Sequence, residues 1–143
     1  MRSLIIIGCL LASLAISVSN ADTTTNDIAV EAAWVRNVPP VTSTTAGYMQ
    51  LTNTGEKEKL LVGVRSDIAE NIELHNHTMD NGMMRMRRIA HVHLPSGKMV
   101  ALTPGGMHMM IFRLKKPLVA GNVVELELQF ADGSSQIVTA EVK

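Results

Sequence analysis

The chain has 143 residues, which suits a single domain, and its 13 Lys and Arg balance its 13 Asp and Glu. A neutral chain lacks the excess of basic side chains that marks proteins binding nucleic acid or an anionic membrane. Neither partner is therefore expected.

Residues 1–21 have the pattern of a secretory signal peptide. Arg2 supplies a positive charge, Leu4 to Val18 is almost wholly apolar, and small residues precede the cleavage that we expect after Ala21. The apolar run is short for a membrane span. "IIGC", which ends at Cys9, resembles a lipoprotein cleavage box but lies too near the start, so we expect no lipid. The predicted mature chain is periplasmic and has no cysteine for a disulfide or a thiolate ligand.

After a polar leader at residues 22–27, short β-type segments alternate with turn signals. Alternation is strict near the end, where Val124, Leu126, Leu128 and Phe130 share one face. This pattern predicts seven or eight strands in one antiparallel β-sandwich domain over residues 28–143. The expected strands are residues 28–36, "AGYMQLTNTG", "KLLVGVRS", 71–77, 84–93, 108–114, "NVVELELQF" and "SQIVTAEV".

Histidine and methionine are concentrated in one segment of the chain. All five histidines lie between His75 and His108, and eight of ten methionines lie between Met79 and Met110. Methionine that only filled the core would be spread over all strands. Imidazole with thioether and without cysteine favours Cu(I), whereas zinc recruits cysteine or carboxylate and calcium or magnesium needs oxygen ligands.

The stretch "MHMMIFRL" divides between two faces of a strand, because alternate residues point the same way. His108 and Met110 share one face and form a candidate ligand pair. Met109 and Ile111 point to the other face, where we expect them in the core.

The spacing of four of these donors resembles that of a known family. His75 is followed after ten residues by Met86, and Met86 after 21 by His108 and then Met110. This H-x10-M-x21-H-x-M pattern, with "IELHNH", "DNGMMRMRRI" and "LTPGGMHMMIFRLKKPL", is similar to the periplasmic copper chaperones (PCu(A)C) that supply the copper A centre of cytochrome c oxidase. The resemblance covers residues 28–143.

The resemblance implies a cupredoxin-like, Greek-key β-sandwich of about seven to nine strands that binds one Cu(I) per chain. Its implied ligands are His75, Met86, His108 and Met110. Its implied partners are the copper A subunit of the oxidase and a thioredoxin-like assembly protein. Relatives with a second, divalent copper site carry it on a His- and Met-rich tail, which we do not expect here. We expect a carrier that releases copper by ligand exchange, and no enzyme.

Two other functions fit the same sequence. One is a periplasmic copper sequestration protein without an oxidase partner, and the other is a structural β-sandwich module with incidental methionines. The roles of His77 and of Met79, Met83 and Met84 stay open. The pair His91 and His93 is either a weak divalent site or an exposed strand face.

Overall fold

The computed structural model describes residues 27–143, so the predicted signal peptide and its cleavage site lie outside the described residues. Every regular element in this part of the chain is a β-strand, and none of its segments forms a helix that could cross a membrane. The ten strands are β1 (Ile28–Val35), β2 (Thr44–Asn53), β3 (Lys59–Arg65), β4 (Ala69–Asp80), β5 (Met83–Arg88), β6 (Val92–Leu94), β7 (Met99–Leu102), β8 (His108–Leu114), β9 (Val123–Phe130) and β10 (Ser135–Val142).

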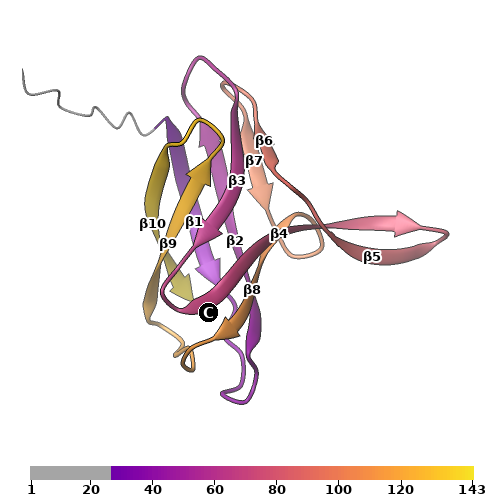
Figure 1. The fold of residues 1–143 in the computed structure, drawn as a ribbon, viewed down its shortest axis with the longest axis vertical. Coiled ribbons are helices and arrows are strands. Elements are labelled where there is room, and N and C mark those ends of the chain that lie inside the picture. The colour runs from indigo at the N-terminus through magenta and orange to yellow at the C-terminus, as the bar shows by residue number, and fades with distance from the viewer. Residues whose placement is uncertain (1–26) are drawn as a thin grey trace, which may run out of the picture.

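The strands form one sheet in the order β5-β4-β8-β2-β1-β10-β9-β3-β6, and β7 pairs with the second half of β2. One core cluster includes Leu51 from β2, Leu61 from β3 and Leu126 from β9, so the two halves of the sheet face each other (Figure 1). The expected all-β sandwich is confirmed.

Two details of the strand arrangement differ from the prediction. The run at residues 84–93 is divided between β5, which pairs with β4, and β6, which pairs with β3 at the far end of the sheet order. With the unpredicted β7, the strands number ten instead of seven to nine. In addition, β1 and β10 run parallel, which is possible because no hairpin joins them.

The face of β8 that carries Met109 and Ile111 is buried, as the alternation predicts. Met109 and Ile111 are fully buried in the core, which confirms that Met109 is a packing residue. Gly47 is its cross-strand partner, and a Cβ at position 47 would lie only 2.8 Å from the Met109 Cε. A methionine side chain therefore covers the bare backbone of β2 at this point.

Strands β4 and β5 form a hairpin that projects from the body as an arm (Figure 1). All six residues of β5 are exposed. The hairpin loop is Asn81-Gly82, with φ of 50° and 77°. Asn-Gly with two positive φ angles is the preferred two-residue loop of the type I′ turn, so the local sequence fixes the register of this arm.

Replacing Met109 by alanine is expected to lower the free energy of unfolding by about 2–5 kcal/mol, because it leaves a cavity in the core. Urea denaturation of the metal-free protein measures this loss. Met83→Ala, at an exposed position of β5, is the control and should change stability by less than about 0.5 kcal/mol. Equal stability of the two variants would contradict the core role of Met109.

Candidate metal centre

The register of three strands brings the four motif side chains to one face of the sheet. His75 of β4 lies directly opposite His108 of β8, and Glu73 lies opposite Met110. Along its other edge β4 pairs with β5, and there His77 lies opposite Met86. Directly opposite residues project to the same face, and so do alternate residues of one strand. The two imidazoles and two thioethers of the motif therefore share a surface.

A cavity of about 340 Å³ opens on this face. His77, Met86, His108 and Met110 line it, together with residues that include Tyr48 and Arg36. His75 does not line the cavity but stands beside it, with its ring centroid 6.0 Å from that of His108.

His108 is held rigidly and presents one free nitrogen. Its side chain is 3% exposed, and its Nδ1–H donates to the Gly106 carbonyl over 2.8 Å. A carbonyl only accepts, so the proton of the neutral ring is on Nδ1 and the lone pair is on Nε2. Burial lowers the pKa of His108 and thus favours this neutral, ligating form.

His75 has the opposite tautomer. Its Nε2–H donates to the Glu73 carboxylate over 2.9 Å, and this hydrogen bond lowers the pKa of Glu73. The Nδ1 of His75 is buried and has no partner among the described residues. A carboxylate that orients an imidazole while its other nitrogen binds an ion is a recurring arrangement in metal sites. The unpaired nitrogen therefore fits a metal ligand.

The donor set determines which ion fits. Within residues 27–143, no three His, Cys, Asp or Glu side chains are arranged to hold a metal ion. A site on this face consequently needs the sulfurs of Met86 and Met110, and thioethers select soft monovalent copper. Met86 is 48% exposed, which leaves one side of the site open to an incoming ligand.

Aromatic side chains pack near His108. Trp34 and Tyr48 pack together, with ring centroids 4.5 Å apart. The Tyr48 ring, on the neighbouring strand β2, also lies 6.4 Å from the ring of His108. Tyr48 and Glu73 carried no signal in the sequence, because both reach the site through contacts across strands or along one strand face.

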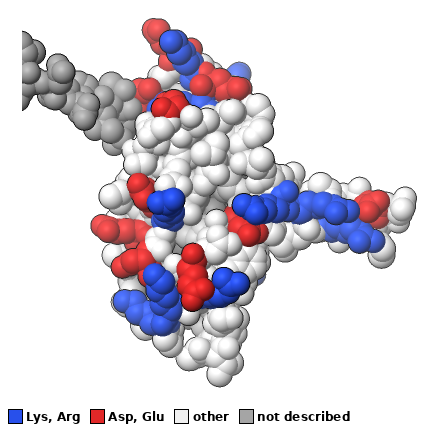
Figure 2. Space-filling view, viewed as in Figure 1, with Lys and Arg blue, Asp and Glu red and all other residues white. Residues whose placement is uncertain are grey.

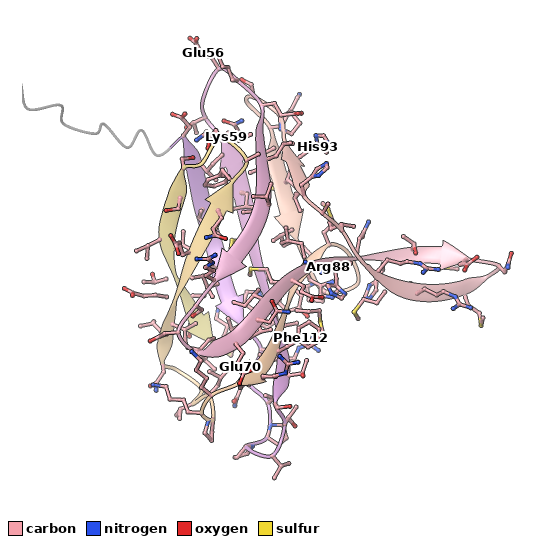
Figure 3. The ribbon with its side chains drawn as sticks, in the orientation of Figure 1. Glu56, Lys59, Glu70, Arg88, His93 and Phe112 are labelled. Atoms are coloured by element: carbon pink, nitrogen blue, oxygen red, sulfur yellow. The ribbon has the colours of Figure 1, made fainter. Side chains whose placement is uncertain are left out.

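His93 lies on β6, well away from Phe112 of β8 (Figure 3), and His91 comes directly before β6. Their Nε2 atoms are 3.2 Å apart, and the Nδ1 of His93 is 3.2 Å from a carboxylate oxygen of Glu58. Both histidines are exposed. Whether this pair takes a divalent ion stays a prediction.

A larger hollow, of about 620 Å³, lies between β3 and β4. Its wall includes Arg65, Glu70, Arg88 and Lys115, and no histidine or methionine. This hollow is the larger of the two, but its side chains offer no soft ligand, whereas those of the smaller cavity do.

The chain matches one protein family, two related proteins and several solved structures. The model of the family described as "Putative lipoprotein LpqE-like" matches residues 28–142. "Putative lipoprotein Lxx21020" of Leifsonia xyli is 34% identical over 117 residues, which are 81% of this chain and 69% of that protein. "Uncharacterized protein RP573" of Rickettsia prowazekii is 34% identical over 113 residues, and the match spans 62% of its length.

Among solved structures, the copper-bound PCuAC domain of PmoF2 shares the fold, with a TM-score of 0.69 and 23% identity over 82% of this chain and 92% of that domain. Apo-DR1885 of Deinococcus radiodurans has a TM-score of 0.65 and 30% identity, over 100% of this chain and 96% of that protein. Its Cu(I) form has a TM-score of 0.59 and 34% identity, over 78% and 74%.

The lowered pKa of His108 predicts how the stability of the metal-free protein depends on pH. Below the ordinary value of 6.5, the unfolded chain binds a proton at this histidine that the folded chain does not yet accept. The free energy of unfolding should therefore fall as the pH drops from 7 to 5, as measured by urea denaturation at each pH.

His108→Gln should flatten this pH dependence, and His91→Gln, at an exposed position, should leave it unchanged. The carboxylates with lowered pKa values titrate below this window and do not interfere. If the free energy of unfolding of the His108 variant still fell equally with pH, His108 would not be the source of the pH dependence.

Proposed function

This chain belongs to the LpqE-like family, and we propose that it binds one Cu(I) per molecule and passes it to another protein. The resemblance to copper chaperones predicted from the sequence is confirmed by the PCuAC domains among its structural relatives. DR1885, 34% identical in its Cu(I) form, supports the choice of ion. The observation that carries the proposal is the unpaired Nδ1 of His75 opposite His108, beside two thioethers.

The proposed ligands are the Nδ1 of His75, the Nε2 of His108 and the sulfurs of Met86 and Met110. Glu73 and the Gly106 carbonyl orient the two imidazoles by holding their other nitrogens. The residue that completes the cavity beside them, His77, offers a further imidazole at the edge of the same site.

Four neutral ligands leave the positive charge of Cu(I) uncompensated. A recipient with thiolates therefore binds the ion more strongly and removes it by exchange, entering as one thioether leaves. The exposed side of Met86 gives such a ligand access.

The proposed recipient is the copper A subunit of cytochrome c oxidase, with a thioredoxin-like protein preparing its cysteines. This choice rests on the family resemblance in the sequence. The arm next to the site carries Arg85, Arg87 and Arg88, which form a basic strip along its length (Figure 2). Although Arg85 and Arg87 both contact Asp80, the excess of positive charge favours docking onto an acidic surface.

We place the protein outside the cytoplasm, in the periplasm. The N-terminal sequence has the pattern of a signal peptide, and the family and its Leifsonia relative are named lipoproteins. The expected processing is cleavage after Ala21, which exports the chain.

A copper sequestration protein would have the same site but no recipient, and a structural module would have the same fold but no bound ion. Anaerobic Cu(I) titration distinguishes a carrier from a structural module, because the module would bind close to zero copper ions per chain. Copper transfer to a recipient distinguishes a carrier from a sequestration protein.

Met86→Leu and Met110→Leu keep side-chain volume and remove the sulfur. Each should lower Cu(I) affinity by at least about 100-fold, the upper end of what the loss of a merely orienting residue costs. The melting temperature of the metal-free protein should change little. Competition with a chromophoric Cu(I) chelator measures the affinity.

Met109→Leu is the matched control, because it makes the same substitution on the opposite, buried face of β8. It should keep the affinity of the unaltered protein. If all three variants bound Cu(I) equally, methionine ligation would be wrong.

The Cu(I)-loaded protein should metallate a soluble fragment containing the copper A site faster than the same amount of Cu(I) supplied as a chelate. The reason is that direct exchange avoids free copper. Appearance of the absorption of the assembled centre reports the rate. Equal rates from the two copper sources would favour sequestration over delivery.

A further inference from the structure

The arm carries a second group of soft donors on the same face as the metal centre. Met79 of β4 lies directly opposite Met84 of β5, next to the pair formed by His77 and Met86. These four residues alternate along two paired strands, so their side chains form a two-by-two array on one face. The array is adjacent to the proposed copper site and shares Met86 with it.

His77 connects the array to the inner site. Its ring centroid is 5.2 Å from that of His108, and it lines the cavity together with Met86 and Met110. Its Nδ1 is buried and has no partner among the described residues. A buried imidazole nitrogen without a hydrogen bond is costly, unless it receives a ligand.

Exposure rises from the inner site toward the turn of the arm. His108 is 3% exposed, Met86 48%, Met84 63% and Met79 67%. Packing does not explain apolar side chains that are exposed to this degree on both strands of a hairpin. Binding of a soft ion does explain thioethers that face each other across the strands.

We propose that His77, Met79 and Met84 form an outer Cu(I) site, which shares Met86 with the inner one and through which copper enters and leaves. This inference rests on the proposed function. It assigns a role to the arm that the four-residue motif does not include.

Transfer between the two sites is ligand exchange without oxidation. Bonds from copper to the His75 Nδ1, the His108 Nε2 and the Met110 sulfur break as bonds to the His77 Nδ1 and to the sulfurs of Met79 and Met84 form, and Met86 remains bound. The ion stays Cu(I), and no proton or electron moves, because every exchanged donor is neutral.

The test compares two variants of the arm. Met79→Leu/Met84→Leu removes the outer sulfurs, whereas Met83→Leu makes the same substitution at the neighbouring position of β5, which faces the other way. Stopped-flow transfer of Cu(I) to a chromophoric chelator gives the release rate, and equilibrium competition gives the affinity.

We expect the double variant to release copper at least about tenfold more slowly, with unchanged inner-site affinity, and Met83→Leu to behave like the unaltered protein. In addition, a second equivalent of Ag(I) should shift the methyl resonances of Met79 and Met84 in the unaltered protein.

Equal release rates in the two variants, or Ag(I) shifts confined to Met86 and Met110, would overturn the outer site and leave the proposed carrier function intact. Absence of tight binding of one Cu(I) to the unaltered protein would instead refute the carrier function itself. The two failures are therefore distinguishable.

Discussion

The register of β4 against its two neighbours is the constraint on which the site depends. Against β8 it places His75 opposite His108, and against β5 it places His77 opposite Met86. A shift of one residue in either pairing would turn a donor to the other face, since side chains alternate with a period of two. The Asn81-Gly82 loop fixes one register through its positive φ angles, and the packing of Met109 over Gly47 supports the position of β8 next to β2. Local turn chemistry and core packing thus align donors that are 35 residues apart in the chain.

Methionine occupies two kinds of position here, and burial distinguishes them. Met109 is fully buried and fills space between strands, whereas Met86 is half-exposed and lines the cavity. The two imidazoles differ in their hydrogen-bond partners. His75 is oriented by a carboxylate and His108 by a backbone carbonyl, so the two rings present different nitrogens to the same region. Both imidazoles are held by fixed partners, so little orientational entropy would be lost if they bound an ion.

Much of the fold could be predicted from the sequence, because alternation in β8 and β9 reports directly which face is buried. The facing of His108 and Met110 followed from the same rule. Elements that depend on distant pairing could not be predicted, such as the division of residues 84–93 between two edges of the sheet, or the parallel contact of β1 with β10. The motif indicated four site residues, and the structure brings them to one face. Glu73 and His77 share the face of His75 through alternation along β4, whereas Tyr48 joins them only through cross-strand geometry, which single-sequence patterns do not encode. Their roles as ligands or supports stay predictions.

The position of β1 has a consequence for biosynthesis. This first strand lies between β2 and β10, so the sheet cannot close until Ser135–Val142 has been synthesised. Strands β1, β2, β4, β5 and β8 are synthesised earlier and pair with one another along one half of the sheet order. The other half depends on pairing between distant segments, which slows folding. The shared core, which includes Leu51 of β2 and Leu126 of β9, is therefore completed late, when the last strands join the half-sheet that carries the histidines of β4 and β8.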